Sequence, residues 1–127
     1  TYSNRTEVIQ MIGDENTLSV LSKMMELSTK KHQVIANNIA NANTPGYIRR
    51  DLSFESEMSR VINSKDWSSL RKLEGNVSLD ESNTARNDGN NVNLTQEMNE
   101  MSQNGILYDL VHTAFKSRVG LIKSAIK

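Results

Sequence analysis

Apolar positions recur every three or four residues along the first third of the chain. From residue 18 to residue 42 the steps alternate between three and four, which is the spacing of the a and d positions of a heptad repeat. This stripe consists of Leu18, Leu21, Met25, Ser28, His32, Ile35, Ile39 and Ala42. It predicts a helix over residues 15–43, about 43 Å long at 1.5 Å per residue, that pairs with a second helix. Asp14 or Asn16 is the expected N-cap.

The last third of the chain carries a longer stripe of the same kind. Its heptad positions are Met98, Met101, Gly105, Tyr108, His112, Phe115, Val119, Ile122 and Ile126. Asn93 is a good N-cap, and Gln96 three residues later completes a capping-box pattern, so we expect a helix over residues 93–127. A second apolar edge follows the same helix at Ile106, Leu110, Ala114 and Leu121, which predicts contact with more than one partner.

The two stripes together predict a mainly α fold, in which two long terminal helices pair as a coiled-coil-like hairpin. Residues 1–43 form the N-terminal helical segment, 44–92 a short irregular middle section that projects from the hairpin, and 93–127 the C-terminal helix, all within one structural domain. Two helices bury one stripe each, so the second apolar edge requires another chain. We therefore expect a subunit that completes its fold on assembly.

The middle section begins with a turn and short elements. Pro45 disfavours helix at the residue before it, and Pro45-Gly46 suits positions i+1 and i+2 of a type II turn. Alternation after Tyr47 predicts an extended segment. Ser53 is the expected cap of a short helix with acidic residues in its first turn and one apolar face. That face consists of Phe54, Met58, Val61 and Ile62.

Residues 64–91 carry the weakest pattern. Trp67, Leu70 and Leu73 fit one or two amphipathic turns, while Val77 and Leu79 fit a short strand. The remainder is rich in Ser, Asn, Asp and Gly. We interpret this stretch as a surface excursion that packs on a neighbour or stays mobile. At the other end of the chain, a short helix around residues 8–12 is only weakly indicated.

Charge and composition exclude several classes of partner and site. The 15 basic and 15 acidic residues balance, which gives no electrostatic reason to expect a nucleic acid or an anionic membrane as partner. There is no Cys, which excludes disulfides and cysteine metal sites. No apolar run is long enough to span a bilayer, and the N-terminus leads into no signal-peptide core. If the protein leaves the cytoplasm, we expect a route that needs no cleaved signal.

Candidate chemistry is sparse. His32 and His112 both lie on the heptad stripes, where polar residues that set helix register are the simpler interpretation, and a metal site would need further ligands at recognisable spacing. Glu97 and Glu100 fit a solvated first helical turn. Trp67 fits an interface anchor as well as local packing. We therefore predict no catalytic residue, no metal, no cofactor and no small-molecule substrate.

Four Asn residues within seven positions mark the end of the first helix, although Asn is a mediocre helix former. Asn37, Asn38 and Asn41 lie off the apolar stripe. We hypothesise that their amides bond to backbone in the turn over residues 44–50, or in an adjacent subunit, and fix how the chain leaves the helix. A frayed and solvated helix end is the alternative.

Residues 38–47 read Asn-Ile-Ala-Asn-Ala-Asn-Thr-Pro-Gly-Tyr, which closely resembles the N-terminal signature of bacterial flagellar axial proteins: rod, hook and hook-associated. The continuation from Ile48 to Phe54 resembles the B-type proximal rod proteins, as do residues 88–92, Glu97-Met98 and Tyr108. The near rival is the C-type rod protein, which usually has a longer Gly/Pro insertion after this signature.

The resemblance implies a structural subunit of the flagellar basal-body rod, which passes through the flagellar type III export apparatus without a cleaved signal. Its implied partners are copies of itself, other rod proteins, and the rod-adapter protein and membrane ring at the rod base. The terminal helices would form an inner tube around the export channel. A helical adaptor or export chaperone and a metal-dependent enzyme using His32 and His112 are the other hypotheses.

Overall fold

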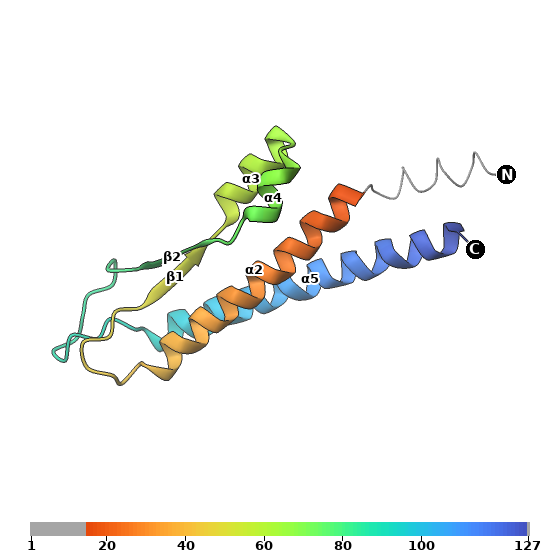
Figure 1. The fold of residues 1–127 in the computed structure, drawn as a ribbon. Helices are drawn as coiled ribbons and strands as arrows, with labels where there is room; N and C mark the ends of the chain where they lie inside the picture. The colour runs from red at the N-terminus through yellow and green to blue at the C-terminus, as the bar shows by residue number, and fades with distance from the viewer. Residues whose placement is uncertain (1–14, 127) are drawn as a thin grey trace.

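The computed structural model describes residues 15–126, so the weak helix expected near residues 8–12 and the cap at Asp14 lie outside the described residues. Along this range, no helix is long and apolar enough to cross a membrane. The predicted mainly α class is confirmed (Figure 1). The elements are α2 (Glu15–Ala40), β1 (Arg50–Ser53), α3 (Glu55–Ser64), α4 (Trp67–Lys72), β2 (Asn76–Leu79) and α5 (Leu94–Ile126).

The long helices α2 and α5 lie side by side and antiparallel, as the two stripes predict (Figure 1). A hydrogen bond between the helices shows which residues lie opposite each other: Asn104 Nδ2 of α5 donates to the carbonyl oxygen of Ser28 of α2 at 2.8 Å. The first helix ends at Ala40, three residues before the predicted end. Its last turn tightens, because the amide of Ala42 bonds to the carbonyl of Ile39 at 3.2 Å. Asn16 lies inside α2 and does not cap it.

The heptad frame predicted for the last third of the chain is half right. Met101, Tyr108, Phe115 and Ile122 are half-buried, but Met98 and Ile126 are 61% and 59% exposed. The buried residues of α5 are Glu97, Asn104 and Val111, each one position before a predicted site. Two of these three residues are polar. A pattern that counts only apolar residues therefore placed the positions 98, 105 and 112 in the helix contact, one residue after the positions that are buried.

The two histidines are both exposed, so the interpretation that they set register in the helix core is wrong. His32 is exposed on α2. The stripe positions before and after it, Ser28 and Ile35, are buried. The ring of His112 stacks on Tyr108 with centroids 6.0 Å apart. No group of three His, Cys, Asp or Glu side chains that could hold a metal ion exists within residues 15–126.

The middle section folds back along α2 instead of projecting, and this corrects the prediction (Figure 1). The main apolar cluster joins Leu27 of α2, which is fully buried, to six buried residues of the middle section. These are Leu52, Phe54, Met58, Val61, Leu70 and Leu73. Val20, Met24 and Val34 of α2 pack against the same cluster. Together with Leu27 they form a second apolar stripe on α2, with helical spacing, that the sequence reasoning overlooked.

The strands β1 and β2 form an antiparallel ribbon in which Leu52 lies opposite Val77. Both strands were expected from the sequence, but not their pairing. Leu52 is buried against α2, whereas Val77 and Leu79 are more than half exposed. Gly75 has a φ of +77°, and a Cβ there would lie 3.1 Å from the Leu52 side chain, so this residue both turns the chain and makes room for the core.

The short helices α3 and α4 complete the middle section. The N-cap position of α3 is Phe54, not Ser53, and the Glu55 carboxylate accepts the Phe54 amide proton at 3.0 Å. Ile62 was predicted on the buried face but is 37% exposed. Asp66 caps α4. Trp67 packs locally against the apolar cluster, and buried residues at both ends of the stretch 64–91 (Leu70, Leu73, Asn90 and Asn91) anchor it within the chain.

Candidate functional site

The ends of both long helices meet the middle section in a polar cluster. We call this cluster the joint and define it as Asn38, Tyr47, Arg49, Asp80, Asn90, Asn91 and Glu97. Its residues come from α2, the turn after it, the end of β2, the loop before α5 and the first turn of α5. These segments come from three separate parts of the sequence, residues 38–49, residue 80 and residues 90–97, and side-chain hydrogen bonds hold them together.

The turn that leads into the joint has the predicted type II form. The Tyr47 amide bonds to the Thr44 carbonyl at 3.2 Å, with Pro45 and Gly46 at the two central positions. Gly46 has a φ of +75°, which type II turns require at this place. The turn reverses the chain so that Tyr47 reaches back to Asn38 of α2 and Arg49 reaches Glu97 of α5.

Asn38 is fully buried and bonds to both backbone groups of Arg50. Its Nδ2 donates to the Arg50 carbonyl at 2.8 Å, and its Oδ1 accepts the Arg50 amide at 2.9 Å. The Tyr47 hydroxyl donates to the same Oδ1 at 3.0 Å. The amide hypothesis is therefore confirmed for Asn38, since its side chain bonds to backbone within residues 44–50. These bonds pair the helix with the start of β1.

The other two asparagines of the hypothesis act locally. Asn41 donates from Nδ2 to the Asn37 carbonyl at 2.8 Å and accepts from the Thr44 hydroxyl at 3.1 Å, which caps the end of α2. Asn37 itself is exposed. Of the three, only Asn38 lies on the face of α2 that β1 covers, so only its amide reaches the strand.

A buried arginine occupies the centre of the joint. Arg49 is 1% exposed and donates from Nε to Glu97, which is 0% exposed, at 2.6 Å. Its two Nη atoms donate to Asp80 and, at 3.2 Å, to Glu100. Burial alone would lower the pKa of the guanidinium, but Glu97, Glu100 and Asp80 outweigh it and raise the pKa above its ordinary value. The cation therefore stays charged inside the protein.

Asn91 and Asp80 close the network around the backbone of Arg49. The Arg49 amide donates to Asn91 Oδ1 at 2.7 Å, and Asn91 Nδ2 donates to the Asp80 carbonyl at 2.7 Å. Hydrogen bonds from the Ser82 hydroxyl and amide, followed by Arg49, hold the pKa of the Asp80 carboxyl below its ordinary value. Asp80 and Glu100 form the more exposed side of the network, with side chains that are 25% and 28% exposed.

The loop before α5 crosses the turn after α2. Asn90, which is fully buried, donates from Nδ2 to the carbonyls of Asn41 and Thr44 at 2.8 and 2.9 Å. A Cβ on Gly89 would lie 3.3 Å from the Gly46 Cα, so the two glycines permit this close crossing. The loop thereby adds a second hydrogen bond to two carbonyls just after α2, which also accept the amides of Thr44 and Tyr47.

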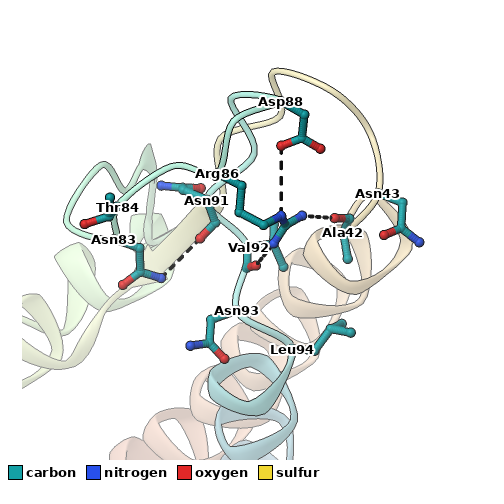
Figure 2. A pocket seen from close by; sticks show the side chains of 10 residues that line it. All are labelled: Ala42, Asn43, Asn83, Thr84, Arg86, Asp88, Asn91, Val92, Asn93 and Leu94. Atoms are coloured by element: carbon teal, nitrogen blue, oxygen red, sulfur yellow. Dashed lines mark hydrogen bonds and ion pairs between the residues drawn. The ribbon is translucent and has the colours of Figure 1, made fainter.

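Arg86 completes the crossing. Figure 2 shows its guanidinium reaching the carbonyl oxygens of Ala42 and Val92, with Asp88 on its other side. One side chain thus ties the end of α2 to the start of α5. The hollow beside it has a volume of about 560 Å³. The polar side chains that line this hollow, such as Asn83 and Arg86, form hydrogen bonds to other parts of the chain. These bonds connect the end of α2 with the start of α5.

The other predicted residues of the two apolar stripes lie on α2 and α5, which pack against each other. They are half-buried: Leu18, Leu21, Met25, Ile39, Phe115, Val119 and Ile122. Ile35 is buried at 2%. The second apolar edge of α5 is not covered by any part of residues 15–126, because Ile106, Leu110 and Leu121 are 62%, 65% and 50% exposed. A shallow groove along this edge includes Ile106, Leu110 and Ala114.

Sequence reasoning missed the roles of Arg49, Asp80, Asn90, Asn91 and Glu97. Glu97 was interpreted as a solvated acid, although it is the most buried carboxylate in the joint. The available signal was indirect. Arg49, Asn90, Asn91 and Glu97 all lie in the motifs that carry the family resemblance, but nothing in one sequence says which motif contacts which.

Comparison with known proteins decides the family. A model described as "Flagella basal body rod protein" matches residues 28–47, from the middle of α2 through the turn. The "Flagellar basal body rod protein FlgB" of Borrelia hermsii is 30% identical over 114 residues, which cover 76% of this chain and 84% of the relative. The chain belongs to the FlgB family of flagellar basal body rod proteins.

Two further FlgB proteins support this assignment. That of Aquifex aeolicus is 31% identical over 96 residues, covering 72% of this chain and 77% of the relative. The FlgB protein of Bacillus subtilis is 29% identical over 120 residues, which cover 87% of this chain and 92% of the relative. These names favour neither a C-type rod protein nor an adaptor or chaperone. The matched segment 28–47 includes Asn38 and Tyr47, so part of the joint lies within the part of the chain that the basal body rod family model matches.

Proposed function

We propose that this chain is a structural subunit of the flagellar basal-body rod, which polymerises into the drive shaft that transmits torque and surrounds the export channel. Its partners are copies of itself and other rod proteins, with the rod-adapter protein and the membrane ring at the base. It reaches this place in the periplasm through the flagellar type III export apparatus. Membership of the FlgB family supports the structural role.

The exposed apolar edge of α5 is the observation that carries this proposal. Ile106, Leu110, Ala114 and Leu121 lie at helical spacing on a different face of α5 from the residues that contact α2. Large apolar side chains that are more than half exposed gain stability when a partner covers them, at about 25 cal/mol per Å² of buried area. A neighbouring subunit in an open helical arrangement provides that cover.

The joint suits the transmission of load. A drive shaft must not let the middle section swing relative to the helices that form the tube. Asn38 and Arg49 cross-connect both helices with β1 through buried bonds, and such bonds hold only in one geometry. Torque applied to the outer part of the subunit would therefore reach α2 and α5 without a hinge at this point.

Leu110→Asp tests the proposal, with Leu110→Met as the matched control. Residue 110 is 65% exposed, so neither change should disturb the isolated fold. We expect Leu110→Asp to prevent incorporation into basal bodies and to abolish motility, whereas Leu110→Met supports both. Normal motility and normal basal bodies with Leu110→Asp would show that this edge is not an assembly surface.

A further inference from the structure

Ser28 and Asn104 meet where α2 and α5 face each other, next to a hollow between the two helices. Asn104 Nδ2 donates to the Ser28 carbonyl at 2.8 Å, and both residues are buried. The hollow has a volume of about 300 Å³, and its lining includes Thr29 and His32 of α2 and Gly105 of α5. Neither the joint nor the apolar edge includes the two buried residues.

Each of these two residues has a buried polar atom without a hydrogen-bond partner among residues 15–126. The atoms are Ser28 Oγ and Asn104 Oδ1, and each exposes less than 1 Å² to solvent. A buried polar group without a partner is costly, and native structures pair nearly all such groups. Because both atoms are sealed from the surface, no neighbouring chain can supply a partner unless α2 and α5 move against each other.

The Ser28 hydroxyl is not turned back onto its own helix. Ser19 and Thr29 of α2 donate to the carbonyls four residues before them, at 3.0 and 2.9 Å. Such bonds are a common way for a serine or threonine within a helix to satisfy its hydroxyl. Ser28 makes no such bond within residues 15–126, although it is 1% exposed. Its hydroxyl is therefore available to α5.

The simplest missing bond joins the two atoms to each other. The Ser28 hydroxyl can donate, and Asn104 Oδ1 can only accept. The nitrogen of the same amide already bonds to the Ser28 carbonyl, so a small shift of α5 would bring the amide oxygen to the hydroxyl. Asn104 would then bond to Ser28 through both ends of its amide. The free subunit has the first of these bonds but not the second.

The surroundings leave room for this shift. Gly105 lines the hollow, and a Cβ on it would meet no atom within 4 Å, so the space beside it is open. Asn38 Nδ2 donates to Glu97 Oε2 at 3.2 Å, which fixes α5 to α2 at the joint. From His112 to Ile126 no residue of α5 is buried. The helix can therefore pivot about the joint and close the hollow.

The apolar edge lies where a neighbour can press α5 toward α2. Ile106, which is 62% exposed, is two residues and thus about 200° around the helix from Asn104. It therefore faces away from α2. A subunit that packs on Ile106 would bear on α5 from the side opposite to the Ser28 contact.

We propose that packing of a neighbouring subunit on this edge moves α5 toward α2, closes the hollow and lets the Ser28 hydroxyl donate to Asn104 Oδ1. The proposal rests on the assembly function above and adds a conformational change within the subunit. The coupling is reciprocal, so the closed packing favours assembly as much as assembly favours the closed packing. The helix pair of an assembled subunit is thereby more firmly joined than that of a free one.

Ser28→Ala tests the missing bond, with Ser22→Ala as the matched control at an exposed position of the same helix. In the free chain, Ser28→Ala removes a buried hydroxyl that has no partner, so its urea midpoint should exceed that of the control. When the two variants compete for basal bodies, Ser28→Ala should be incorporated about five-fold less, the effect of one lost hydrogen bond. A urea midpoint below that of the control, or equal incorporation, would overturn the proposal.

The second test measures the movement and exploits the absence of Cys from the chain. Spin labels on Ser22→Cys/His112→Cys report the distance between the distal parts of α2 and α5, and those on Asn37→Cys/Asn99→Cys report it at the joint. All four positions are exposed and lie outside the apolar edge. Labelled chains are diluted with unlabelled ones, so that double electron–electron resonance measures distances within one subunit.

We expect the distal distance to be shorter by about 2 Å in basal bodies than in the free chain, and the joint distance to be the same in both. An unchanged distal distance in incorporated chains would overturn the closure and leave the assembly function intact, which Leu110→Asp tests separately. Equal changes in both distances would also overturn it, because a pivot about the joint moves the distal part alone.

Discussion

The two ends of the α2–α5 pair are built differently. At the joint end, the buried residues of α2 run from Leu27 to Asn38 and those of α5 from Glu97 to Val111. Toward the other end, from Glu15 to Glu26 and from His112 to Ile126, no described residue of either helix is buried. Figure 1 shows that the middle section lies along α2, where Val20 and Met24 of the part without buried residues also pack against the apolar cluster, and that the last turns of α5 extend beyond the middle section.

This difference separates a part that folds on its own from a part that a polymer completes. The joint half has both the apolar cluster around Leu27 and the buried ion pair of Arg49 and Glu97. The distal half has half-buried apolar residues such as Leu21 and Phe115, and the exposed edge that begins at Ile106 in the joint half continues into it as far as Leu121. Helices with so little burial are marginal in water, so neighbouring subunits must supply the rest.

The largest predicted effect is in the joint. Arg49→Ala leaves Glu97 buried without its cation, and breaking a buried pair in this way costs about 3–5 kcal/mol of unfolding free energy. Arg50→Ala is the control, because Arg50 is exposed and such changes stay within about 0.5 kcal/mol. Urea denaturation of the purified chains measures both. Equal stability of the two variants would refute the central role of Arg49.

The next effect separates two adjacent asparagines. Asn38→Ala removes the hydrogen bonds to the backbone amide and carbonyl of Arg50 and leaves both groups without these partners. We therefore expect the free energy of unfolding to fall by about 1–3 kcal/mol. Asn37→Ala changes an exposed helical position and should stabilise the chain by up to about 0.5 kcal/mol. The same denaturation experiment compares them. A similar loss from both variants would favour a general role of the Asn-rich stretch over a specific one of Asn38.

A smaller effect on the free chain is predicted in the distal half. Phe115→Asp should cost the isolated subunit about 1 kcal/mol, because its side chain is only half-buried there. The same variant should not enter basal bodies, and Leu21→Asp should behave alike. Val111→Asp, at a residue 6% exposed, should instead unfold the free chain. The contrast fails if Phe115→Asp destabilises the monomer as much as Val111→Asp.

The smallest effect concerns pH. The pKa of Asp80 lies below its ordinary value of 3.8 in the folded chain, so its contribution to stability is present above that pH. The contribution is lost as pH falls through the lower, folded pKa. Asp80→Asn should therefore flatten the loss of stability below pH 3.8, measured as the urea midpoint against pH. An unchanged acid slope would mean that Asp80 titrates as it does in the unfolded chain.

Periodicity and turn chemistry predicted most of the secondary structure. The two long helices, the Pro45-Gly46 turn, both strands and both short helices follow from local patterns, because each depends on residues close in sequence. The frame of α5 was displaced where Glu97 and Asn104 are buried, since polar residues are counted as exposed. The joint was not predictable, because Arg49 and Glu97 are 48 positions apart and only the fold pairs them.

The family resemblance and the physical reasoning were complementary. The motifs at residues 38–47, 88–92 and 97–98 indicated which positions matter, and the structure shows that they meet in one cluster. Asn38 was the exception that residue chemistry alone could reach, because four asparagines at a helix end are unfavourable unless their amides gain bonds. Its neighbour Asn37, chosen on the same grounds, lies on the exposed side of α2.

Hydrogen exchange along α5, in the free chain and in isolated basal bodies, tests the difference between the two halves most directly. In the free chain we predict protection of the amides from about residue 97 to Val111 and rapid exchange from His112 to Ile126, because only the first part is buried. In basal bodies both parts should be protected. Uniform protection along α5 in the free chain would contradict the account, since the distal half would then need no neighbour.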